Sequence, residues 1–155
     1  MIKSLSLLLV LALPVVVQAQ FTFTINDDNT LTITGYTGTN SDVAVPDAID
    51  GYPVTEIGYD AFDSATSITN LILPTSLNNI ELWAFAGCSG LASISIPEGV
   101  TNIGVGAFAY CSGLTEVVIP NQVESVAGWT FSSCYGLTNV VLGTNVRTVG
   151  NRAFV

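Results

Sequence analysis

Residues 91–113 read LASISIPEGVTNIGVGAFAYCSG, and this 23-residue pattern decides the fold because it recurs along the chain. The recurrence keeps the same or a closely similar residue at each of several positions, always 23 residues apart. These positions hold Ile57, Ile80, Ile103, Val126 and Val149; Phe62, Phe85, Phe108, Phe131 and Phe154; and Cys88, Cys111 and Cys134. A fixed period of this length is the signature of a stacked solenoid, in which each unit buries its apolar face only against its neighbours.

Each unit contains a short strand and a compact turn. Ile94-Ser95-Ile96 alternates as a strand does, and Pro97 ends it because proline cannot extend a hydrogen-bonded ladder. The segment 83–88 predicts one turn of α- or 3₁₀-helix. Strands one repeat apart must pair in parallel, and such crossovers coil right-handedly. The sequence therefore predicts an α/β repeat solenoid, with a parallel β-sheet on one face and short helical or 3₁₀ turns on the other.

The repeats occupy residues 42–155, and the last repeat is incomplete. Before them, residues 21–36 alternate apolar residues with Thr around Asp27-Asp28-Asn29, which predicts a β-hairpin. We expect residues 20–41 to form an N-terminal cap over the first coil. That coil is atypical: five more residues than in later units lie between Pro46 and Ile57, including the turn signal Asp50-Gly51-Tyr52-Pro53.

Residues 1–19 have the features of a secretory signal peptide. Lys3 supplies the positive start, residues 5–17 form the apolar region, and Val17-Gln18-Ala19 is a small-residue cleavage site. We expect cleavage after Ala19, no membrane span afterwards, and a secreted or cell-surface location. An uncleaved anchor is the alternative.

Composition and charge exclude several functions. The chain has 12 acidic residues against 3 basic ones, a formal net charge of -9, and no His. Such acidity disfavours nucleic acid and anionic membranes as partners. The lack of His removes the usual triad and proton-shuttle chemistry, and the carboxylates Glu98, Glu116 and Glu124 occupy different repeat positions. We predict no enzymatic activity, no cofactor and no metal site.

The three Cys share one repeat position, which Ala65 fills one repeat earlier. A position that accepts Cys or Ala predicts a small buried apolar site, where a free thiol packs as a compact hydrophobe. We expect buried free thiols, although a disulfide between two stacked neighbours stays open as an alternative.

The spaced residues of this unit are similar to a known family. The pattern Leu91-x-x-Ile94-x-Ile96-Pro97-x-x-Val100-x-x-Ile103-Gly104-x-x-Ala107-Phe108-x-x-Cys111-x-x-Leu114 resembles the 23-residue repeat of BspA-like leucine-rich-repeat proteins, over residues 43–155. The departures are Ala65 for Cys, Glu81 and Ala127 for Gly, Thr130 for Ala, and Gly143 for Pro. The resemblance implies a leucine-rich-repeat solenoid and an exported bacterial surface protein linked to adhesion and host-protein binding. It brings no catalytic residues with it.

Two sets of residues are candidates for a binding site. The first set flanks the inward position of each strand, on the sheet face where solenoids usually bind. It comprises Asn70 and Ile72, Ser93 and Ser95, Glu116 and Val118, and Asn139 and Val141. The alternative is that the β-branched members are simply good strand formers.

The second set is Trp83 and Trp129, which share one repeat position with Gly106 between them. Asp60 and Arg152 hold the same position elsewhere, so we expect it to reach solvent. The strand rise predicts two rings about 10 Å apart, with a gap that accepts a protein side chain or a sugar ring. The alternative is that each indole folds over the adjacent turn.

The sequence favours an extracellular recognition or adhesion module whose ligand is a protein or a carbohydrate. A passive spacer, or a fragment of a larger surface protein with an anchor or enzymatic domain downstream, is the alternative. Because the chain stops at Phe154-Val155 within a repeat, end-to-end self-association through the uncapped last repeat is a further prediction.

Overall fold

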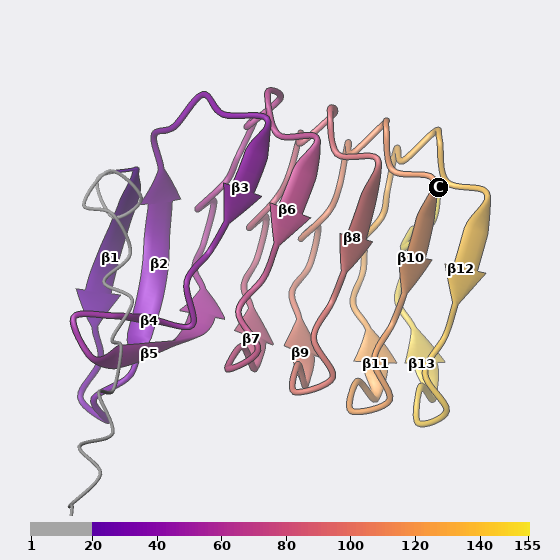
Figure 1. Cartoon of the computed structure of the whole chain (residues 1–155). Coiled ribbons are helices and arrows are strands. Elements are labelled where there is room, and N and C mark those ends of the chain that lie inside the picture. The colour runs from indigo at the N-terminus through magenta and orange to yellow at the C-terminus, as the bar shows by residue number, and fades with distance from the viewer. Residues whose placement is uncertain (1–19) are drawn as a thin grey trace, which may run out of the picture.

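The computed structural model of the chain describes residues 20–155, so the predicted signal peptide lies outside the described residues. The chain forms about five stacked coils (Figure 1). Each coil has a three-residue strand, its long strand, and a second strand of two residues, except that the second strand of the first coil, β5, has six residues. The row of long strands consists of β3 (Asp42–Ala44), β6 (Asn70–Ile72), β8 (Ser93–Ser95), β10 (Glu116–Val118) and β12 (Asn139–Val141). The other row consists of β5 (Tyr52–Ile57), β7 (Asn79–Ile80), β9 (Asn102–Ile103), β11 (Ser125–Val126) and β13 (Thr148–Val149).

We number the coils from the start of each long strand: coil 1 is 42–69, coil 2 is 70–92, coil 3 is 93–115, coil 4 is 116–138 and coil 5 is 139–155. The long strands form the sheet face of the molecule. Each second strand is followed by a turn segment, and together the segments 58–65, 81–88, 104–111, 127–134 and 150–155 form the turn side.

Strand pairing follows the sequence period. Ser93 pairs in parallel with Glu116, and Glu116 with Asn139, a shift of one 23-residue repeat each time. Coil 1 pairs with coil 2 through Val43 and Leu71, 28 residues apart. The five extra residues fold back as an antiparallel pair of β4 (Ala48–Ile49) with β5, around Asp50 and Gly51, which both have positive φ. The predicted turn at this insertion is confirmed.

The ladders are not continuous along the stack. Within residues 20–155, no ladder joins β6 to β8 in the sheet face, and none joins β9 to β11 in the other row. At each break the ladder in the opposite row still joins the two coils, through β7 with β9 and through β8 with β10. The turn side joins them as well, where Phe85 donates to Ala107 at 2.8 Å and Phe108 donates to Thr130 at 2.9 Å.

The predicted helical turns are wrong, since residues 20–155 contain no helix. The turn segment of coil 2 holds Trp83 at φ 57° and Gly87 at φ 71°, and the same two positions are left-handed in other coils. A left-handed residue cannot continue a right-handed helix. Successive backbone amides of the segment instead donate alternately to the next coil and within the segment. Trp83 donates to Val105 of the next coil at 3.1 Å, and Ala84 donates to Glu81 of its own segment at 3.3 Å.

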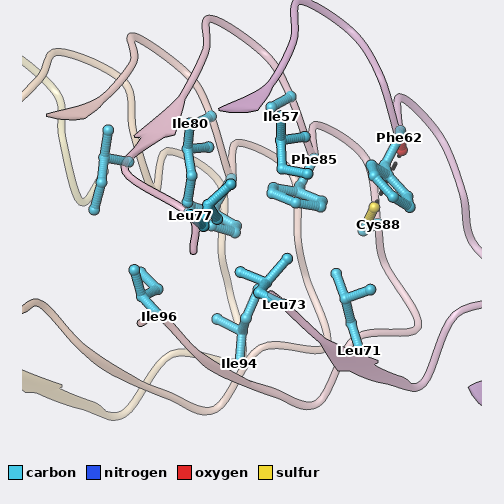
Figure 2. Close-up of a cluster of buried hydrophobic side chains, with 14 of the residues drawn as sticks. Ile57, Phe62, Leu71, Leu73, Leu77, Ile80, Phe85, Cys88, Ile94 and Ile96 are labelled. Atoms are coloured by element: carbon cyan, nitrogen blue, oxygen red, sulfur yellow. Dashed lines mark hydrogen bonds between the residues drawn. The ribbon is translucent and has the colours of Figure 1, made fainter. Parts of the chain in front are cut away.

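Stacked phenylalanine rings form the spine of the core. Centroids of neighbouring rings from Phe62 to Phe154 are 5.0 to 5.4 Å apart, and the three pairs from Phe85 onward lie within 9° of parallel. Figure 2 shows Phe62 and Phe85 among buried Ile and Leu side chains of the core. Because each ring packs on rings from adjacent coils, burial of this spine depends on stacking, as the repeat predicts.

The cysteines line up beside this spine and are buried and free, as expected. Each thiol donates to the carbonyl oxygen of a phenylalanine one coil earlier: Cys88 to Phe62 at 3.2 Å (Figure 2), Cys111 to Phe85 at 3.2 Å, and Cys134 to Phe108 at 3.1 Å. Burial raises the pKa of the Cys88 thiol to about 12, so it stays protonated and unreactive.

An antiparallel hairpin of β1 (Phe21–Ile25) and β2 (Leu31–Tyr36) precedes the coils, and β2 pairs in parallel with β5. Its aromatic side chains extend the ring stack, because Tyr36 lies on Phe62 with centroids 5.2 Å apart. Phe21 packs against Tyr36 in turn, with centroids 5.7 Å apart. Both hairpin strands were expected from the alternation of Thr with apolar residues.

Candidate functional site

The sheet face carries the first set of candidate residues on its outer side. In β6, β8 and β10 the central residue is buried and its two neighbours are exposed. Asn70, Ser93 and Glu116 therefore form one exposed row, and Ile72, Ser95 and Val118 form a second row beside it. Asn139 and Val141 continue these rows on β12, where the central Val140 is also exposed.

The small serines of β8 make a trough across this face. Ser93 and Ser95 line two hollows of about 350 and 400 Å³, one toward β6 and one toward β10. Ile72, which is 58% exposed, and Val118, which is 52% exposed, stand on the strands at either side. The result is a polar floor between two aliphatic walls, an arrangement that can receive an apolar side chain while the hydroxyls bind its backbone.

The tryptophans do not stand as two free rings with an open gap. Carbon atoms of the Trp83 ring lie so close to Gly106 that a Cβ there would be 2.4 Å from them, and Gly106 is buried. Trp129 lies against Arg152, whose guanidinium carbon is 4.8 Å from the ring centroid. Each indole folds over the next coil and is half-buried. This is the arrangement considered from the sequence as the alternative.

Trp83 nevertheless lines a groove of about 460 Å³ on the turn side. Its other lining residues come from three coils and are Tyr59, Asp60, Asp63, Ser64, Ala86, Gly87 and Tyr110. Hydrogen bonding to Asp60 raises the pKa of the Tyr59 phenol, and the negative charge of Asp60 and Asp63 adds to the effect. Two rings and two carboxylates therefore share the groove with Trp83.

Sequence analysis missed Tyr59, Asp63, Ser64 and Tyr110 as neighbours of Trp83. A signal was present, because Ser64, Gly87 and Tyr110 share one repeat position, and Gly87 follows Trp83 by four residues in the same turn segment. Gly87 is the residue that keeps the groove open, because it has no side chain to fill the space between Ser64 and Tyr110. Its φ of 71° is one that glycine adopts without strain.

Within the described part of the chain, no group of three or more His, Cys, Asp or Glu residues could hold a metal ion. Among residues 20–155 there is also no helix long and apolar enough to cross a membrane.

The coil geometry and the repeat define a leucine-rich-repeat solenoid. The profile described as "BspA type Leucine rich repeat region" matches residues 50–155 in six copies. The chain belongs to this family, as its sequence pattern indicated.

Solved bacterial structures show the same fold. A leucine rich cell surface protein from Faecalibacterium prausnitzii is 32% identical with a TM-score of 0.68; the match covers 88% of this chain and 44% of that chain. A leucine-rich repeat protein from Bacteroides capillosus is 31% identical with a TM-score of 0.65, covering 79% of this chain and 94% of that one. The Treponema pallidum leucine-rich repeat protein is 24% identical, with a TM-score of 0.60 over 85% of this chain and 84% of that one. None of the curated proteins matches the chain.

Proposed function

We propose that the chain is a non-catalytic recognition module, secreted or held at the cell surface, that binds a partner protein through its sheet face. The serine-floored trough between Ile72 and Val118 carries this proposal, because it combines exposed aliphatic area with exposed hydroxyls on adjacent strands. The signal-peptide features of residues 1–19 and the cell-surface description of the Faecalibacterium relative support the location.

The hairpin of β1 and β2 serves in this proposal as the cap of the first coil. Its Phe21 and Tyr36 rings cover Phe62, which the first coil would otherwise present to water. At the other end of the described residues, Val149, Phe154 and Val155 are exposed.

The test uses the double variant Ser93→Arg/Ser95→Arg, which fills the trough without touching the core, since both serines are exposed. The matched control is Asn78→Arg/Gln122→Arg, which adds the same charge at exposed positions away from the long strands. Both proteins and the parent chain are assayed by surface plasmon resonance on immobilised purified extracellular-matrix proteins and neutral glycans.

We expect binding to at least one matrix protein by the parent and the control, and about tenfold or greater loss for the trough variant, equivalent to removing about 1.4 kcal/mol. Equal binding by all three proteins would move the site away from the sheet face. Binding to glycans alone would replace the protein partner by a carbohydrate. No binding to either class would favour the passive spacer.

A further inference from the structure

The groove on the turn side is separate from the sheet face and has a different chemistry. Ala86 and Gly87 lie at its floor, Trp83 and Tyr110 line the side toward coil 3, and Tyr59 with Asp60 and Asp63 lines the side of coil 1. Tyr59, Tyr110 and both carboxylates are exposed. Its volume of about 460 Å³ lies within the range of roughly 300–1,000 Å³ typical of ligand sites.

The charge of the groove is negative and is not balanced by the described chain. Among residues 20–155 the only basic side chains are Arg147 and Arg152, and both belong to coil 5, whereas the groove lies on coils 1 to 3. The two carboxylates already act on the Tyr59 phenol, whose pKa is raised by contact with Asp60 and by the charge of both residues. A cation entering the groove would relieve this uncompensated charge.

The molecule shows at a second place how this repeat position binds a cation. Trp129 occupies the position of Trp83 two coils later, and the Arg152 guanidinium lies over its ring at 4.8 Å. In the coil after Trp83 the matching residue is Gly106, so no arginine of the chain is available there. Trp83 therefore has the same ring at the same backbone position, but carboxylates as neighbours in place of a guanidinium.

We infer that the groove of Tyr59, Asp60, Asp63, Trp83 and Tyr110 binds an arginine side chain presented by a partner protein. The guanidinium packs against the aromatic rings that line the groove, reaching Trp83 from the side that Gly106 does not cover, and donates hydrogen bonds to the carboxylates. Arginine suits this mixture better than lysine, because its planar group stacks and donates in a fork at once.

The experiment follows the fluorescence of Trp83 in the variant Trp129→Gly, where it is the single tryptophan. Glycine occurs at this position in coil 3, so the substitution suits the left-handed backbone. The probe is N-acetyl-arginine amide, with N-acetyl-glutamine amide as the neutral counterpart. We expect a saturable change in emission with the arginine probe only, weakened by salt because the contact is charged.

Three further variants, made in the same background, locate the response. Asp60→Asn/Asp63→Asn should raise the dissociation constant about tenfold, since two charged contacts are lost. The control Glu98→Gln/Glu124→Gln removes the same amount of charge from exposed positions outside the groove. It should leave the dissociation constant unchanged. Gly87→Tyr copies the residue that coil 3 carries as Tyr110 and should abolish the response by filling the floor. Thermal melts by circular dichroism show whether each variant is folded.

Equal responses to the arginine and glutamine probes would overturn the inference. So would a dissociation constant that changes less than twofold in Asp60→Asn/Asp63→Asn, even if Gly87→Tyr fails to fold. A saturable response to a neutral disaccharide such as cellobiose, with no response to the arginine probe, would show that the groove binds a sugar and not a cation. None of these results bears on the sheet face, so the two proposals fail independently.

Discussion

Coils 3 and 5 carry the same pattern of residues, but only coil 3 is covered on both sides. The central strand residue is 6% exposed at Ile94 in coil 3 and 37% exposed at Val140 in coil 5. The ring of Phe108 is fully buried, whereas Phe154 is 39% exposed. Because the backbone positions match and the residues compared are Ile against Val and Phe against Phe, the difference comes from the neighbouring coil. In this fold a residue is buried by its place in the stack and not by its own unit.

The largest effect is expected from a charge in the covered part of the stack. Leu114, at the end of coil 3, is fully buried, so Leu114→Asp places an unpaired carboxylate in the core. We expect complete loss of the cooperative thermal transition, measured by circular dichroism at 218 nm. The control is Ser112→Asp, at an exposed position two residues away whose side chain makes no hydrogen bond within residues 20–155, and it should melt like the parent chain. An unchanged melt of Leu114→Asp would show that the coils do not share one core.

Removing the same ring from the two coils compares them directly. Phe108→Ala should lower the free energy of unfolding by about 3–5 kcal/mol, because a buried ring leaves a cavity between two stacked rings. Phe154→Ala should cost less than half as much, since this ring stacks on Phe131 alone. Urea titration with near-ultraviolet circular dichroism measures both values. Equal losses would contradict the dependence of burial on the neighbouring coil.

Alkaline pH should weaken the covered coils through Cys88. The pKa of this thiol is about 12 in the folded chain against an ordinary value of 9.0, so the folded state keeps a proton that the unfolded state loses. This contribution to stability is complete below pH 9 and is lost as the pH rises to 12, at up to about 1.4 kcal/mol per pH unit. Urea midpoints measured from pH 8 to 11 should fall less steeply in Cys88→Ala, which copies Ala65 of coil 1. The same dependence of the urea midpoint on pH in the parent and in Cys88→Ala would show that Cys88 does not contribute to the loss of stability.

The smallest effect is a difference in thiol labelling. Cys134 lies next to coil 5 and lines the hollow beside Phe154 and Val155, whereas Cys88 and Cys111 lie deeper in the stack. We expect Ellman's reagent at pH 8 to label Cys134 several-fold faster than the other two, because coil 5 opens locally more often. Single-cysteine variants with Ala at the other two positions measure each rate. Similar rates at the three sites would indicate global unfolding as the route of access.

The sequence predicted the features that depend on period and alternation. The parallel register, the single file of Phe62 to Phe154, the buried free thiols and the five-residue insertion in coil 1 follow from spacing alone. The outward orientation of Ser93 and Ser95 follows from alternation around Ile94.

The turn side was beyond prediction for a physical reason. A tryptophan gives no sign in the sequence that its backbone is left-handed, so Trp83 was assigned to a helical turn. The groove was missed because its residues come from coils 1, 2 and 3, and only the stacking distance brings Tyr59 and Tyr110 to the same ring. Spacing fixes which residues are equivalent, whereas contacts across coils depend on side-chain direction.

The insertion in coil 1 shows how the molecule can accept more chain. The excursion of β4 around Asp50 and Gly51 leaves Val43 in register with Leu71, and the ring stack beyond it is undisturbed. A coil can therefore take up extra residues without a change in how it pairs and stacks with the next coil. A foreign loop grafted at the exposed Glu98-Gly99 corner of coil 3 would be displayed from the rim while the register of the flanking strands is kept.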